Sequence, residues 1–144
     1  MNLQAAFWDS SALIPLIVDQ PQSKAAETLY AKFKVVIWWA TEVEIRSGLT
    51  RLKRMGQIAT PEFNQAKQLA ENIVDSSTPL PGNAGLAKNA CKLLEDFPLT
   101  AADAMQLAAA LEACEHQPKG YVFITADQRL TEAARQTGFT VELL

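Results

Sequence analysis

The sequence predicts an α/β fold in three layers, with a central, mainly parallel sheet flanked by helices. Short β-branched or aromatic runs are apolar on both faces, and stretches with helical periodicity separate them. This alternation is typical of parallel strands joined by right-handed crossovers. The chain of 144 residues, 49% of them hydrophobic, has the usual size of one domain. With neither repeats nor a linker in the sequence, we expect a single domain over residues 1–144.

Four runs are predicted as buried strands, at residues 6–8, 35–39, 121–125 and 140–143. Seven helices are predicted at residues 11–18, 23–32, 41–55, 61–73, 83–96, 101–115 and 128–137. The segment "DSSTPLPG" at residues 75–82 has the composition of a loop, and Gly138 provides a helix stop signal. In sheets of this kind, ligands bind beyond the carboxyl ends of the strands. Functional side chains are therefore expected at those ends.

The remaining bulk features indicate the compartment and exclude some chemistries. Cys91 and Cys114 fit neither a disulfide framework nor a zinc site, so we expect reduced thiols. No run approaches the length of a membrane span, and the first residues do not resemble a signal peptide, so a cytoplasmic protein is expected. His116, at a helix end, is expected at the surface, which disfavours a Ser-His-Asp triad.

The charge distribution permits a nucleic-acid partner without requiring one. The net charge of −3 does not indicate a polyanionic ligand. However, the segment "RSGLTRLKR" at residues 46–54 contains four basic residues and no acid. Such a run fits either a solvated helix face or a surface that contacts phosphates.

Two aspartates follow predicted strands. Asp9 ends the apolar run "AFW", and Asp127 follows "YVFITA". Each carboxylate fits a binding site at the edge of the sheet. Each also fits a turn or a helix N-cap, and Thr125 offers an alternative cap beside Asp127.

Glu44 lies beside the apolar stripe of its predicted helix. Gly48 leaves the surface above it without a side chain, and Arg51 lies on the same face, an arrangement that suits a phosphate-bearing substrate. Alternatively, Glu44 is an ordinary exposed acid and Gly48 serves close packing. Glu42 competes for the same role, although the helix dipole favours any acid in the first turn.

Asp103 has the spacing of a capping box with Thr100, but the helix that follows is apolar nearly all round. A carboxylate in the first turn of a buried helix is either part of a cap or part of an interior polar site. Clustered carboxylates cannot all ionise in a dry cleft without a cation. Their oxygens favour Mg²⁺ or Mn²⁺ over Zn²⁺.

Four sequence blocks resemble the PIN domain family, in particular its VapC-type ribonuclease toxins. The blocks are "FWDSSAL" at 7–13, "EIRSGL" at 44–49, "LTAADAMQLAAA" at 99–110 and "FITADQRL" at 123–130. They follow the order and spacing of the family and span nearly the whole chain. Trp8 and Ser10 depart from the commoner residues around the first aspartate, which barely affects the carboxylate set.

The resemblance implies a PIN-like fold and a catalytic acidic quartet that binds divalent metal. The members of the acidic quartet are Asp9, Glu44, Asp103 and Asp127. The motif selects Glu44 over Glu42 and places Thr125 next to the site. The resemblance further implies RNA cleavage, inhibition by a small antitoxin protein and a homodimer.

We therefore predict hydrolysis of RNA phosphodiester bonds that depends on Mg²⁺ or Mn²⁺, with Asp9 and Asp103 as the firmest ligands. Side chains expected beside the metal or on the RNA are Ser10, Thr125, Arg46 and Arg51, with Lys53 and Arg54 as further phosphate contacts. A non-catalytic interaction module with the PIN fold and a housekeeping RNA-processing nuclease are the alternatives. A receiver-like phosphoacceptor domain is disfavoured, because the strand ends do not carry the required Asp and Lys.

Overall fold

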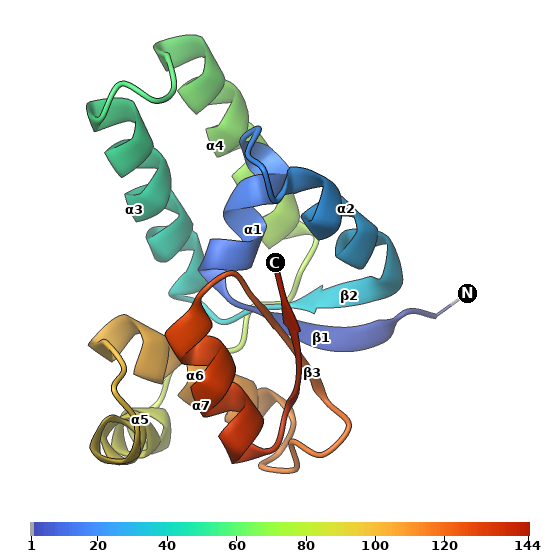
Figure 1. Ribbon diagram of the computed structural model, residues 1–144, viewed down its shortest axis with the longest axis vertical. Coiled ribbons are helices and arrows are strands. Elements are labelled where there is room, and N and C mark those ends of the chain that lie inside the picture. The colour runs from blue at the N-terminus through green and yellow to red at the C-terminus, as the bar shows by residue number, and fades with distance from the viewer. Residues whose placement is uncertain (1) are drawn as a thin grey trace.

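The computed structural model describes residues 2–144 (Figure 1). Its strands are β1 (Gln4–Trp8), β2 (Phe33–Val36), β3 (Val122–Thr125) and β4 (Thr140–Leu143). Its helices are α1 (Ser10–Ile17), α2 (Ser23–Lys32), α3 (Thr41–Arg54), α4 (Thr60–Asp75), α5 (Ala84–Asp96), α6 (Ala101–Ala113) and α7 (Gln128–Thr137). All four predicted strands and all seven predicted helices are present, and every helix end lies within two residues of the prediction.

The four strands form one parallel sheet in the order β2-β1-β3-β4. The chain leaves β1 toward β2 through α1 and α2, but it leaves β3 in the opposite direction toward β4 through α7. The two central strands β1 and β3 are in register, with Trp8 opposite Ile124. A topological switch point, where ligands bind in open α/β sheets, therefore lies between the carboxyl ends of these two strands.

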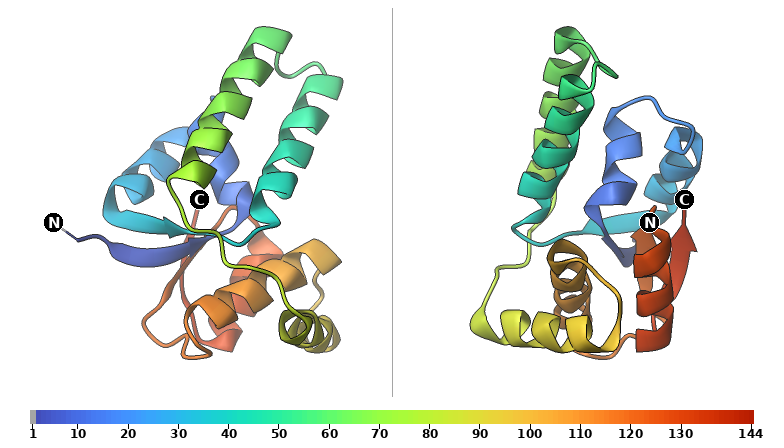
Figure 2. Two further views of the ribbon diagram at one scale, coloured as in Figure 1. Left: turned by 180° about the vertical axis from the view of Figure 1, so that it is seen from behind. Right: turned by 60° about the vertical axis from the view of Figure 1, so that its left-hand side comes forward.

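Each face of the sheet carries its own hydrophobic core, because successive side chains of a strand point to opposite faces. Trp8 and Ile124 pack with residues of α1, α3 and α4. Phe7 and Phe123, whose rings stack at 5.7 Å, pack with α5, α6 and α7. Figures 1 and 2 show α1–α4 on one side of the sheet and α5–α7 on the other. The predicted three-layer α/β fold is confirmed.

The second strand lies earlier in the chain than the sequence predicts. It covers Phe33–Val36 rather than residues 35–39. Ile37 and Trp38 are buried, at 0% and 1% exposure, but they leave the ladder, and Trp38 forms only an isolated bridge with Leu80. Trp39 is 55% exposed. The aromatic run therefore reflects burial of a connecting segment rather than strand pairing.

The sequence-based expectations about thiols and histidine agree with the structure. Cys91 is exposed, Cys114 is partly buried, and both are free thiols. His116 is exposed. Over residues 2–144, no helix combines the length and the apolar character needed to cross a bilayer.

Candidate active site

The carboxyl ends of β1 and β3 lie side by side and carry the first part of the site. The backbone N–H of Asp9 donates to the carbonyl of Ile124 at 2.9 Å, which fixes the end of β1 against β3. Directly beyond this bond, α1 begins on one face of the sheet and α7 on the other. Asp9 and Asp127, which were predicted at strand ends, both lie at this point.

The Asp9 side chain is buried, with 3% exposure, and it does not cap α1. Only its backbone carbonyl takes part in the helix start, accepting from the N–H of Ala12 at 3.0 Å. The carboxylate accepts instead from the hydroxyls of Ser11 and Thr125, the latter at 2.9 Å to Oδ2. The turn-or-cap alternative for this side chain is therefore wrong.

Ser11 is a site residue that the sequence analysis did not single out. Its Oγ donates to Asp9, lies 3.3 Å from Oγ1 of Thr125, and accepts from the N–H of Ala126 at 3.0 Å. It thereby links the first turn of α1 and Asp9 to the end of β3 and the residue after it. A second small hydroxyl residue directly after an aspartate is the signal that was available in the sequence.

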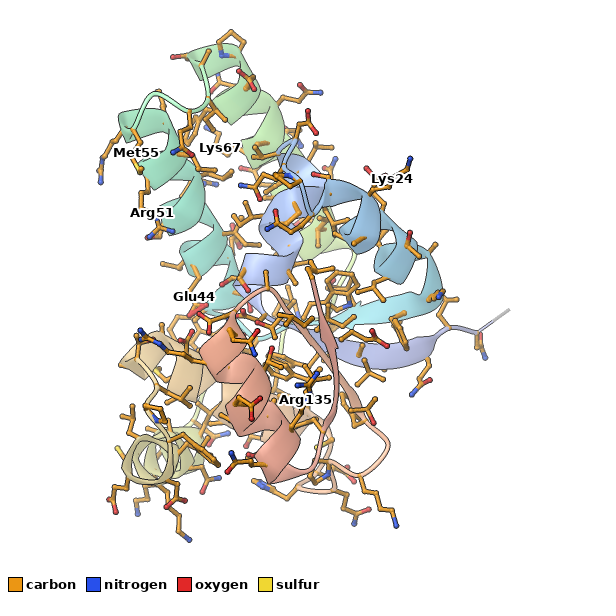
Figure 3. All side chains as sticks on the ribbon, in the orientation of Figure 1. Lys24, Glu44, Arg51, Met55, Lys67 and Arg135 are labelled. Atoms are coloured by element: carbon orange, nitrogen blue, oxygen red, sulfur yellow. The ribbon has the colours of Figure 1, made fainter. Side chains whose placement is uncertain are left out.

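Glu44, in the first turns of α3, faces helices on both sides of the sheet. Ser10 Oγ of α1 donates to Glu44 Oε2 at 3.1 Å, and Gln106 Nε2 of α6 donates to the same oxygen. Figure 3 shows Glu44 at the end of α3 that meets the C-terminal half of the molecule. Glu42 is exposed, so the structure brings Glu44 and not Glu42 into the site. Gln106 was also missed; a single amide in the apolar run "AMQLAAA" was its only signal.

Asp103 and Asp127 lie at the N-termini of α6 and α7. Asp127 does cap its helix, because Oδ1 accepts from the N–H of Leu130 at 3.0 Å, while its own N–H donates to Thr125 Oγ1 at 3.0 Å. At α6 the cap is Thr100, whose Oγ1 accepts from the N–H of Asp103 at 3.2 Å. The Thr100 cap therefore depends on the backbone of Asp103.

The carboxylates influence one another electrostatically. Burial is the main cause that raises the pKa of Asp9 to about 6; the hydroxyls of Ser11 and Thr125 lower it, and the charges of Asp103 and Asp127 raise it further. Burial also raises the pKa of Glu44 to about 7, with smaller contributions from Asp9 and Asp103.

Cationic groups compensate this cluster very little. The pKa of Asp103 is raised first by burial and then by the charge of Asp127, and Arg129 offsets only part of this shift. The two salt bridges in the described part of the chain, Arg46–Glu71 and Arg135–Glu132, include no member of the acidic quartet.

The donor chemistry of this cluster fits a hard divalent cation. Carboxylate oxygens that are buried or partly buried and form no salt bridge within the described residues, next to hydroxyl oxygens, are ligands of the type that Mg²⁺ and Mn²⁺ prefer. Among residues 2–144, no three His, Cys, Asp or Glu side chains lie together in positions that would ligate one ion. Metal binding by the acidic quartet thus stays a prediction.

The raised pKa values predict the pH dependence of stability. The folded protein binds more protons than the unfolded chain from about pH 4, near the ordinary value of 3.8 for Asp9, to about pH 7, the raised value for Glu44. The free energy of unfolding should therefore fall as pH rises through this interval. We expect thermal melts in chelator to show this decline, with a shallower slope for Asp9→Asn. The exposed-site variant Asp19→Asn should keep the parental slope, and a flat parental profile would contradict the burial of these charges.

The basic residues of α3 differ in how far they are already engaged. Arg46 pairs with Glu71 of α4 at 3.5 Å, and Lys53 lies over the ring of Phe63, with its Nζ 4.8 Å from the centroid. Arg51 is exposed, lies outside both salt bridges of the described chain, and extends away from the helix in Figure 3. A groove of about 460 Å³ runs along this helix and is lined by Glu42, Val43, Arg46, Ser47, Thr50 and Arg54.

Gly48 serves packing rather than substrate access. A Cβ at this position would lie 3.2 Å from Ile14 Cδ1, so the absent side chain lets α3 pack closely on α1. The suggestion that Gly48 clears space for a phosphate is therefore wrong, and the close-packing alternative holds.

Known structures show the same fold. PAE2754 of Pyrobaculum aerophilum is similar with a TM-score of 0.66 and 20% identity, over 96% of this chain and 89% of that one. VapC20 of Mycobacterium tuberculosis, a sarcin–ricin loop cleaving toxin, has a TM-score of 0.65 and 18% identity over 90% and 95%. A toxin–antitoxin complex of Klebsiella pneumoniae has a TM-score of 0.61 and 17% identity over 87% and 88%.

A comparison with curated protein sequences gave no match. The sequence model of the PIN domain matches residues 6–136, which include the last three residues of β1, the whole of β3 and the whole acidic quartet. The chain belongs to the PIN domain family.

Proposed function

We propose that this chain is a divalent-metal-dependent endoribonuclease and the toxin of a type II toxin–antitoxin system. The observation that carries the proposal is the Asp9 carboxylate, which is buried at the switch point of the sheet, caps no helix and forms no salt bridge with any residue from 2 to 144. The charges of Asp103 and Asp127 contribute to the raised pKa of Asp9, and the charge of Asp9 contributes to the raised pKa of Glu44. Membership of the PIN domain family supports nuclease activity.

In this proposal the acidic quartet holds one or two Mg²⁺ or Mn²⁺ ions. A bound ion would supply an activated water and neutralise charge on the phosphoryl oxygens. Ser11 and Thr125 orient Asp9 by donating to it, and Ser10 does the same for Glu44. Because Oδ1 of Asp127 accepts the capping bond of α7, we assign Oδ2 to the site.

RNA binding is proposed along α3. Arg51 lies seven residues after Glu44, about 10 Å along the helix axis, and therefore suits a phosphate next to the scissile one. Arg46 and Arg54 line the adjoining groove, although Arg46 is partly occupied by Glu71. These side chains would position the RNA backbone without reading its sequence.

A small antitoxin protein is the proposed partner. The structures similar to this chain include the toxin–antitoxin complex of Klebsiella pneumoniae, which supports this assignment. The homodimer and the cytoplasmic location stay predictions. Expression of the parent, but not of Asp9→Asn, should arrest growth, and co-expression of the cognate antitoxin should relieve the arrest.

The direct test is metal dependence measured on stability and on cleavage. Metal bound only by the folded protein stabilises it by about 2.7 kcal/mol at a hundredfold excess over Kd. We expect millimolar Mn²⁺ to raise the melting temperature of the parent and to support cleavage of single-stranded RNA, with both effects absent in EDTA. Cleavage that persists in EDTA, or a melt unmoved by Mn²⁺ together with no cleavage, would refute the proposal.

A further inference from the structure

Gln106 is a buried polar side chain that the acidic quartet does not explain. It lies on α6 with 0% exposure, and the helix around it is apolar. Nε2 donates to Glu44, but Oε1 is buried without a hydrogen-bond partner among the described residues. An unpartnered buried amide oxygen is unfavourable for folding. Stability alone would thus favour an apolar side chain at this position.

The bond from Gln106 is one of two that reach the same atom. Ser10 of α1 donates to Glu44 Oε2 at 3.1 Å, from the opposite side of the sheet. Oε2 of Glu44 therefore receives two donors, from α1 and α6, while α3 supplies the carboxylate itself. No hydrogen bond or salt bridge within residues 2–144 involves Glu44 Oε1.

We infer that Gln106, together with Ser10, is a positioning residue that holds Glu44 by Oε2 and leaves Oε1 as the oxygen offered to metal or substrate. The catalytic consequence of this inference rests on the proposed nuclease function, but the contact between Gln106 and Glu44 does not depend on it. Groups that orient a metal ligand in this way typically change metal affinity or activity by about 10- to 100-fold when removed. A residue that merely filled the core would act independently of Glu44.

The test is a double-mutant cycle with a shape-matched substitution. Gln106→Met keeps an unbranched side chain of similar length and removes the donor, and Glu44→Ala removes the acceptor. Both single variants and the double variant are compared by urea unfolding in EDTA, Mn²⁺ calorimetry, and kcat and KM on single-stranded RNA. Met105→Leu, on the same helix, serves as the packing control. If Gln106→Met does not fold, Ser10→Ala removes the other donor to Glu44 Oε2 and tests the same inference.

We expect Gln106→Met to lower kcat about 10- to 100-fold with KM for RNA within about twofold, and to lower Mn²⁺ affinity only when Glu44 is present. Its urea midpoint should match or exceed that of the parent, because the unpartnered oxygen is removed. Equal losses of Mn²⁺ affinity with and without Glu44, or no loss in either background, would overturn the inference.

The inference and the proposed function can fail separately. A parent protein that cleaves no RNA with Mn²⁺ would refute the nuclease proposal. The double-mutant cycle of urea unfolding in EDTA would still show whether Gln106 and Glu44 interact. Non-additive changes in the urea midpoint for Gln106→Met and Glu44→Ala support the interaction, and additive changes reject it.

Discussion

Replacing Asp9 with Asn is expected to abolish metal-dependent RNA cleavage while the fold stays intact. An Asn side chain keeps an oxygen that accepts from Ser11 and Thr125, so the link between the two central strands survives. It lacks the negative charge that a divalent cation requires. We expect a loss on the order of 10³-fold or more in kcat/KM, together with loss of Mn²⁺ binding.

The same variant should be more stable than the parent when metal is absent. Burial raises the pKa of Asp9 from 3.8 to about 6, so the ionised carboxylate costs up to about 3 kcal/mol at neutral pH. Chemical unfolding at about pH 7.5 in EDTA measures this gain, and Asp19→Asn, at an exposed position, is the matched control. A less stable Asp9→Asn that retains proportionate activity would show that Asp9 is structural, and the acidic quartet would lose its central member.

Asp103→Asn is expected to have the second-largest effect on activity with little change in stability. The cap of α6 uses the backbone N–H of Asp103 and the hydroxyl of Thr100, so the amide substitution leaves it intact. The charge it removes is one that burial and Asp127 disfavour in the metal-free protein. We expect cleavage to fall by at least about 10²-fold and the melting temperature in EDTA to be maintained or raised.

The matched control for Asp103→Asn is Asp96→Asn, which removes an exposed carboxylate at the end of α5. Cleavage with Mn²⁺ and circular dichroism of both variants complete the comparison. If Asp103→Asn cleaves RNA as fast as the parent, Asp103 serves only the start of its helix, and the metal assignment for this residue is wrong.

The layers of the fold could be predicted because periodicity and helix signals agree along most of the chain. Ser23–Lys32 and Gln128–Thr137 were predicted to the residue. The strand predicted at residues 35–39 was shifted because an apolar aromatic segment has the same sequence pattern whether it pairs as a strand or only fills a core. Trp38 fills the core beside α5 and α6 and pairs with Leu80 only through a single bridge.

The candidate site was predictable in its acids but not in the contacts that orient them. Carboxylates at strand ends and helix starts are visible along the chain, and topology brings those ends together. Gln106 could not be assigned, because a polar residue in a buried helix gains meaning only from its neighbour across the interface, here Glu44. The role of Gly48 could not be predicted for the same reason, because its packing neighbour Ile14 belongs to another helix.

The bond between Thr125 and Asp9 also has a consequence for biosynthesis. These residues are 116 positions apart in the sequence, although Asp9 directly follows β1 and Thr125 ends the adjacent strand β3. At about 5–20 residues per second, translation leaves roughly 6 to 23 s between their appearance. During that time β1 has only β2 as a possible sheet partner, and Asp9 lacks the hydroxyl of Thr125. Under the proposed function, a nascent chain that ends before β3 lacks both Thr125 and Asp127, so it cannot complete the acidic quartet during synthesis.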